Sequence, residues 1–227
     1  MSIRYRRFFF TFLLIGFLAS LSFTACKKPE TQKQDQVKKE EPVQTGGRIE
    51  NLFGAATVNG KPAKVGQIIK SGDLIELKPR AVCDVMLQKN LSIVRLKAGA
   101  RLKIKELSEK SAGLSLERGW MAGYAVRGRD IRVHTPTAIA SVRGTALCMK
   151  VVNPNNVYAC TCNGKIHYDF GKNGKATDSA AHHKAFHYVK AGGKITRKPG
   201  GMKFHGDEAL NALAGKLGRK IDWKKAE

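Results

Sequence analysis

The chain has 227 residues and carries 41 Lys and Arg against 18 Asp and Glu, a formal net charge of +23 at pH 7. This length is enough for one domain of ordinary size with a real hydrophobic core. A chain this basic usually suggests a nucleic-acid-binding protein. The N-terminus, however, predicts export from the cytoplasm, and we therefore exclude nucleic acid as a partner.

Residues 1–25 have the pattern of a secretory signal peptide. Three arginines within residues 4–7 form a positive region, and the apolar run 8–23 follows them. The run is short for a membrane helix, which needs about 20 apolar residues. It ends in LSFTAC (21–26), which resembles the lipobox of bacterial lipoproteins, where a small residue precedes the cysteine that receives the lipid.

We therefore expect residues 1–25 to be removed and Cys26 to carry the lipid anchor, with palmitate among its acyl chains. The alternative is an ordinary secretory signal that is cut nearby and leaves Cys26 free. A lipidated chain would be held to a bacterial membrane on its extracytoplasmic side, in the cell envelope or periplasm. The anionic partners there are lipid headgroups, envelope polymers and acidic proteins, although the basic residues also suit a merely solvated surface.

A flexible tether is expected over residues 26–47. From Lys27 to about Gly47 the chain consists largely of Lys, Glu, Gln, Pro, Thr and Asp, and two Val are its only apolar residues. A segment of this composition buries too little apolar surface to offset the entropy of ordering. The tether would lift the folded part away from the bilayer.

Residues 48–200 predict an all-β domain. Short runs in which apolar and polar residues alternate follow one another from Ile49, and turn signals such as Asn59-Gly60 separate the early ones. Period-two alternation with a turn about every eight to twelve residues is typical of a β-sandwich, roll or solenoid. The runs span residues 74–77, 81–87, 91–96, 102–105, 114–116 and 131–133.

Several of these segments resemble the FecR domain, a β-rich extracytoplasmic module. The resemblance covers about Gly54 to Val152, and its most specific part is the string VHTPTAIASVRGT (133–145), in which Gly144 suggests a bend before the next strand. The other matching segments are GAATVNG (54–60), VG (65–66), SGDLI (71–75), VRL (94–96) and LSLERG (114–119).

The resemblance implies a compact β-sandwich or roll of many short strands outside the cytoplasm. The family is named after a sensor of ferric-citrate uptake that has a cytoplasmic tail, one membrane span and a periplasmic domain that signals to a sigma factor. In this chain a cleaved leader replaces the cytoplasmic part. We therefore carry over the fold and the location, but not the regulatory activity.

A β-hairpin is predicted within residues 145–162. Its two strands are joined by NPNN (153–156), in which proline suits the second turn position and Asn156 tolerates the left-handed conformation of a following bulge. This turn geometry pairs Asn153 with Val157 and fixes the register of the strands.

Four cysteines follow the lipidated one, and three of them lie in this hairpin. The predicted register places Cys148 opposite Cys162 at a position where side chains approach closely, with Cys160 on the same face. Export to an oxidising compartment favours a Cys148–Cys162 disulfide. Inert thiols are an alternative.

A metal site is the other alternative for these cysteines. Thiolates and imidazoles are the ligands that zinc and related soft metals take in tetrahedral sites. The candidate ligands are Cys148, Cys160, Cys162, His182 and His183, with His187 as a further choice. The other histidines, His134, His167 and His205, stand alone in the sequence, and we expect them to be ordinary surface or core residues.

A short basic helix is predicted within residues 201–227. It begins near Asp207-Glu208, because acidic residues suit the first turn of a helix. Four apolar residues then fall at helical spacing with lysines and arginines around them. This stripe either docks on the β-domain, which is the favoured interpretation, or binds lipid headgroups. The stripe consists of Leu210, Leu213, Leu217 and Ile221.

The sequence brings no nucleophile, base and orienting group together, so we expect no enzyme activity and no cofactor other than the candidate zinc ion. The predicted function is a lipid-anchored, extracytoplasmic binding or envelope-structural module of the FecR type. The alternative is a metal-binding or thiol redox sensor built on the cysteines of the hairpin with His182 and His183.

Overall fold

The structure is a computed structural model that describes residues 46–226. The predicted leader, Cys26 and the tether up to residue 45 lie outside the described residues. Among the described ones, no helix is long and apolar enough to cross a membrane. The elements are β1 (Gly47–Phe53), β2 (Ala56–Val58), β3 (Lys61–Pro62), β4 (Ile68–Ile69), β5 (Leu74–Leu77), β6 (Val82–Leu87), β7 (Ser92–Lys97), β8 (Arg101–Leu107), β9 (Ser111–Ala125), β10 (Asp130–His134), β11 (Ile139–Arg143), β12 (Ala146–Asn153), β13 (Asn156–Asp169), the short 3₁₀-helix η1 (Gly171–Asn173), β14 (Lys175–Ala180), β15 (Lys184–Ala191), β16 (Lys194–Pro199) and α1 (Asp207–Gly215).

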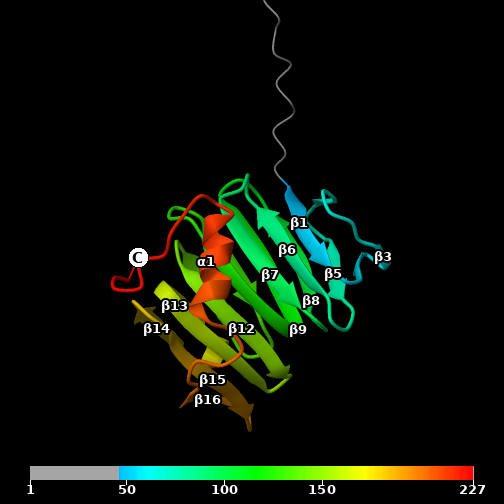
Figure 1. Cartoon of the computed structure of the whole chain (residues 1–227). Coiled ribbons are helices and arrows are strands. Elements are labelled where there is room, and N and C mark those ends of the chain that lie inside the picture. Colours follow the sequence, from blue (N-terminus) through cyan, green and yellow to red (C-terminus); the bar gives the residue numbers. More distant parts are fainter. Residues whose placement is uncertain (1–45, 227) are drawn as a thin grey trace, which may run out of the picture. The chain divides into compact units, whose positions relative to one another are not determined.

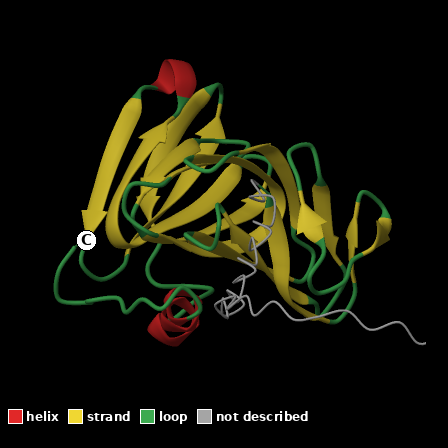
Figure 2. Cartoon of the chain, turned by 90° about the horizontal axis from the view of Figure 1, so that it is seen from above, coloured by secondary structure: helices red, strands yellow, loops and turns green. Residues whose placement is uncertain are grey.

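The strands form two sheets that share the long strands β9 and β13. Sheet A has the order β4-β1-β6-β7-β9-β12-β13-β15-β16. Sheet B has the order β3-β2-β5-β8-β9-β10-β11-β13-β14, in which only the β9–β10 pair is parallel. The all-β prediction with one short C-terminal helix is therefore confirmed, and Figure 2 shows that helix lying outside the strands.

Glycines fold the chain from one sheet into the other. β9 changes sheet at Gly119 and β13 at Gly164, where φ is +84° and +107°. Residues with a Cβ rarely adopt such values, and a Cβ on Gly119 would lie 2.5 Å from Cα of Ala100. Strands that switch sheets through such bends form the corners of a β-sandwich. Gly144 lies between β11 of sheet B and β12 of sheet A, so the bend predicted there is confirmed.

The main hydrophobic core fills the space between the two sheets. The predicted alternation is clear in β10, where Ile131 and Val133 are buried and Arg132 is exposed. β8 repeats the pattern with buried Ile104 beside exposed Lys103. Full burial of one such aliphatic side chain stabilises the fold by about 1.5–3 kcal/mol.

A second hydrophobic cluster lies on the outer face of sheet A. Residues 200–226, which we call the C-terminal strap, cross this face and include α1 (Figure 1). Leu210 and Leu213 of α1 are fully buried against the sheet, so the favoured docking interpretation is confirmed. The helix begins as predicted but ends at Gly215, and Leu217 therefore packs on the cluster from beyond the helix.

The hairpin of β12 and β13 is present, but its predicted register is wrong. Asn153 pairs with Asn156 across a two-residue loop, and Cys148 lies opposite Cys160. The N–H of Asn155 donates to Oδ1 of Asn153 at 2.9 Å and closes the loop, while Asn156 does not take the left-handed conformation. From Leu147 to Val151 the pairing moves by two residues rather than one, and the cysteine side chains therefore keep their predicted face of the sheet.

Candidate metal centre

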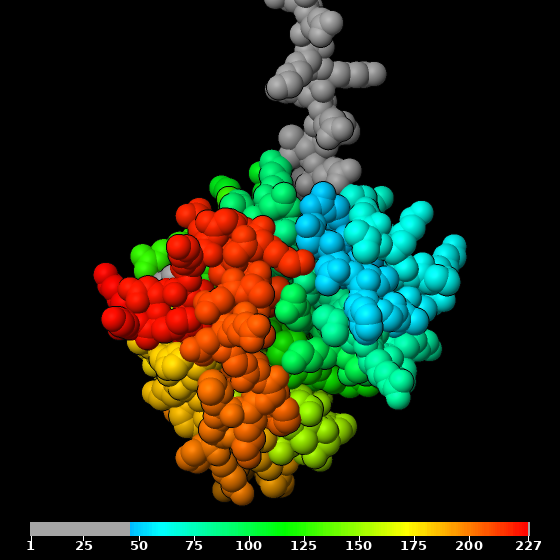
Figure 3. Space-filling view, in the orientation of Figure 1, coloured from blue at the N-terminus to red at the C-terminus, as the bar shows by residue number. Residues whose placement is uncertain are grey.

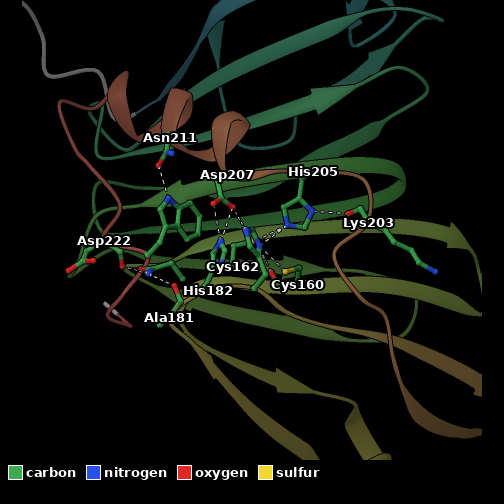
Figure 4. A network of polar contacts seen from close by, with 12 residues as sticks. Cys160, Cys162, Ala181, His182, Lys203, His205, Asp207, Asn211 and Asp222 are labelled. Atoms are coloured by element: carbon green, nitrogen blue, oxygen red, sulfur yellow. Dashed lines mark hydrogen bonds and ion pairs between the residues drawn. The ribbon is translucent and has the colours of Figure 1, made fainter.

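Two cysteines and two histidines converge where the C-terminal strap crosses sheet A. Cys160 and Cys162 come from β13, His183 from the loop between β14 and β15, and His205 from the strap just before α1. Their ligand atoms all lie within 4.8 Å of one another. Figure 4 shows Cys160, Cys162 and His205 of this group close together beneath the start of α1. Two sulfurs and two imidazole nitrogens form one of the donor sets that bind structural zinc.

Three separations among these donors lie close to those of a tetrahedral zinc site. Nδ1 of His183 lies 3.1 Å from Nε2 of His205 and 3.6 Å from Sγ of Cys160. Sγ of Cys162 lies 3.2 Å from Nε2 of His205. Zinc–nitrogen bonds of about 2.0–2.1 Å and zinc–sulfur bonds of about 2.3 Å give tetrahedral edges of about 3.4 Å between nitrogens and about 3.6 Å between sulfur and nitrogen. The observed separations differ from those edges by no more than about 0.4 Å.

The strand and the loop bring three of the donors together by backbone geometry. Residues i and i+2 of a strand point to the same face, so Cys160 and Cys162 both reach the outer face of sheet A. Both side chains are fully buried. The N–H of His183 donates to the carbonyl of Cys162 at 2.9 Å, which holds the loop beside the strand.

The backbone is strained at His183 and at the residue before His205. The φ of His183 is +43°, and that of Phe204, which precedes His205, is +70°. Left-handed values are uncommon for residues with a side chain and are unusual for a bulky one such as phenylalanine. Such conformations persist where the surrounding contacts over-determine them, and they are concentrated at functional sites.

Each histidine donor has a partner for its second ring nitrogen. Nε2 of His183 lies 2.6 Å from Oδ1 of Asp207, the first residue of α1, and Nδ1 of His205 lies 2.9 Å from the carbonyl of Lys203. An acceptor at this position holds the ring proton there and leaves the other nitrogen free to bind a metal. Nε2 of His182 lies 2.9 Å from Oδ2 of the same Asp207, and half of the His182 side chain is exposed.

The electrostatics of the cluster favour negative charge on the sulfur of Cys160. A hydrogen bond with Cys162, followed by those with His183 and His205, lowers the pKa of Cys160 to about 4 despite its burial. Burial acts to lower the pKa of His183, but hydrogen bonds with Cys160 and Asp207 outweigh it and raise that pKa. Burial raises the pKa of Cys162 well above its ordinary value. A coordinated metal ion removes the proton from such a thiol and neutralises the buried charge.

Cys160, His183 and Asp207 also follow the order of a nucleophile, a base and an orienting acid. The side chain of Cys160 is 0% exposed, however, and a nucleophile needs open space in which a reacting atom can sit. Cys162 and His205 instead complete a closed set of donors around the same point. The arrangement therefore suits metal coordination rather than catalysis.

The structure gathers some of the predicted metal ligands and separates others. Cys160, Cys162 and His183 come together in the set of four. His182 lies outside that set, in a second group with His183 and Asp207 whose ligand atoms also lie within 4.8 Å of one another. Nδ1 of His187, the further choice, lies 2.9 Å from Oδ1 of Asn156 instead. Cys148 lies on β12 opposite Cys160 but outside the set of four donors.

His205 is the functional residue that sequence reasoning missed. It was expected to be an ordinary surface or core residue, yet it supplies the fourth donor. The only local signal was its position two residues before the predicted start of a helix. A helix that docks on the β-domain also brings the residues just before it close to that domain. Nothing in the spacing of the cysteines points to it.

The predicted Cys148–Cys162 disulfide is not present, and the four cysteines within residues 46–226 are free thiols. The register places Cys160 rather than Cys162 opposite Cys148. All three sulfurs of the hairpin nevertheless lie in the cluster on the outer face of sheet A, as predicted. Burial raises the pKa of Cys148 well above its ordinary value and that of Cys83 to about 12, so neither is an activated thiol.

Comparison with known proteins gives no family for this chain. No family model matches it, and no curated protein matches it. Two crystal structures of a "putative anti-sigma factor" from Parabacteroides distasonis ATCC 8503 resemble part of it, each with 18% sequence identity and a TM-score of 0.47. Each match covers 56% of this chain and 59% of the other, and so spans less than two-thirds of that protein. This partial likeness assigns no function.

Proposed function

We propose that this chain is a non-enzymatic, lipid-anchored module of the cell envelope that holds a zinc ion through Cys160, Cys162, His183 and His205. The observation that carries the metal-binding part is the convergence of these four donors within 4.8 Å of one another, with three of their separations close to tetrahedral edges. The lipid anchor on Cys26, the extracytoplasmic location and the FecR type rest on sequence patterns alone.

The donor set supports a structural ion rather than a catalytic one. Catalytic zinc sites keep one position for water or substrate, whereas four protein ligands close the coordination sphere. Two thiolates balance the charge of a divalent ion, which suits a site whose sulfurs are fully buried. Thiolate and imidazole ligands at tetrahedral spacing favour zinc over metals that prefer oxygen ligands or square-planar geometry.

The proposed partners follow from the proposed location. The lipid on Cys26 would attach the chain to a membrane, and the excess of lysine and arginine would draw the domain toward anionic envelope polymers, lipid headgroups or acidic proteins. The metal site does not depend on which of these it meets.

The experiment that tests metal binding is elemental analysis of the full chain purified in detergent, together with thiol counting. We expect one zinc ion per chain, and we expect chelation to add two alkylatable thiols. Cys160→Ser and His205→Ala should lower the zinc content. The matched controls are Cys148→Ala, which removes a buried thiol on the same face, and His182→Ala, which removes the neighbouring histidine. Zinc content that is negligible, or equal in ligand and control variants, would exclude this site.

A further inference from the structure

We infer that occupancy of the metal site controls whether the C-terminal strap covers the outer face of sheet A. The inference rests on the proposed function, because it assigns a regulatory consequence to the same site. It begins from the origin of the ligands. Three donors belong to the β-domain, whereas His205 belongs to the strap, so a bound ion joins the two parts directly.

Several contacts between the strap and the β-domain lie at one donor, His183. Asp207 of the strap accepts from its Nε2, and the ring of Trp223 stacks on its ring with centroids 5.1 Å apart. Nearby, the side-chain amide of Asn163 in β13 donates to the carbonyl of Asp222 at 2.9 Å. An ion that fixes the His183 ring therefore fixes a surface against which Asp207 and Trp223 of the strap pack.

The strap has little capacity to stay ordered by itself. Its helix α1 has nine residues, and isolated helices shorter than about 12–15 residues are marginal in water. The residues of the strap that are buried against the sheet are Leu210, Leu213, Ala214 and Ile221. Away from His183, Lys216 forms an ion pair of 3.0 Å with the buried Asp84. The hydroxyl of Tyr158 also donates to the carbonyl of Gly201 at 2.9 Å and accepts from the N–H of Lys203 at 3.2 Å.

The β-domain, in contrast, does not need the strap for its main core. The cluster between the two sheets contains residues from Ile49 to Tyr188 and includes none from the strap. Loss of the strap would therefore be a local opening, of the kind that exposes one element while the rest of the fold persists.

Opening would uncover an apolar surface. The strap lies across this face, where it runs from orange to red in Figure 3. Beneath it lie Met86, Ile93, Trp120 and Tyr124 of sheet A, which are buried in the closed arrangement. Bound zinc thus keeps the strap on this face, and loss of zinc exposes the face to solvent.

Hydrogen exchange on the mature chain in detergent tests the inference, with zinc-loaded and chelated samples compared and zinc measured in each. We expect chelation to lower the protection of residues 207–215 by at least about tenfold and to leave β8 and β10 unchanged. In a Trp120→Phe chain, the single remaining tryptophan, Trp223, should report the same opening by a change in fluorescence.

The outcomes separate this inference from the proposed function. Zinc that binds and is removed by chelator without a change in the exchange of α1 overturns the inference and leaves the metal site intact. Absence of bound zinc overturns both. His205→Ala should increase exchange of α1 in the presence of zinc. His167→Ala, which removes an exposed histidine paired with Thr177 and no strap contact, should not.

Discussion

The substitution Asp207→Ala should weaken zinc binding by about 10- to 100-fold, because outer partners of metal-bound histidines typically contribute that much. Oδ1 of Asp207 lies 2.6 Å from Nε2 of His183, so the carboxylate orients the ring and makes Nδ1 a better donor. The loss corresponds to about 1.4–2.7 kcal/mol of binding free energy. The Asp207 side chain is 40% exposed and α1 loses one acidic residue from its first turn, so the fold itself should lose no more than about 1 kcal/mol.

Competition titration against a chromophoric chelator measures this affinity. Asp207→Asn keeps an oxygen acceptor for His183 and should retain most of the affinity. Glu208→Ala removes the exposed acidic neighbour in the same helical turn and should leave the affinity unchanged. If Asp207→Ala binds zinc as tightly as the unchanged chain, then His183 does not bind the ion through Nδ1, and the proposed geometry is wrong.

Three further predictions concern other parts of the chain. Asp84→Asn should destabilise the fold by about 3–5 kcal/mol in chemical denaturation, because Asp84 is fully buried in an ion pair with Arg95. Burial acts to raise the pKa of Asp84, but hydrogen bonds led by that from Arg95 lower it. The Asp84 carboxylate therefore contributes fully to stability above about pH 4, and this contribution is lost as the pH falls through the lowered pKa. The Asp84→Asn variant should lack this part of the pH dependence of stability. Gly119→Ala should lower the free energy of unfolding by at least about 2 kcal/mol. Gly128 has a similar φ of +82° but open space around it, so Gly128→Ala should lower that free energy less. Equal losses would contradict the clash of a Cβ at position 119 with Ala100. Cys26→Ser should abolish incorporation of labelled palmitate, and a variant that still incorporates it would exclude the lipid site.

The positions of the strands and the faces of their side chains could be predicted from the sequence, because a buried sheet face requires an apolar residue at every second position. The buried Ile131 and Val133 alternate with the exposed Arg132 in β10, and this pattern was sufficient to place the strand. The hairpin shows the limit of such reasoning. A shift of two residues in the pairing keeps Cys148 and Cys160 on the same face, so hydrophobic pattern could not choose between registers. The choice depended on the conformation of the asparagine turn.

The candidate site was only partly accessible for a different reason. Cys160 and Cys162 lie two residues apart on one strand, and their shared face followed from local geometry. His205 joins them from 43 residues further along the chain, through the path of the strap across the sheet. No local period encodes that path. The start of α1 was visible in its acidic first turn, but the direction in which the helix docks was not.

X-ray absorption spectroscopy at the zinc edge of the purified chain tests the central claim most directly. The account predicts two sulfur ligands at about 2.3 Å and two nitrogen ligands at about 2.0–2.1 Å, with imidazole signatures from His183 and His205. One sulfur should be lost in Cys162→Ser. A first shell of oxygen ligands, or one that keeps both sulfurs in that variant, would contradict a zinc site formed by Cys160, Cys162, His183 and His205.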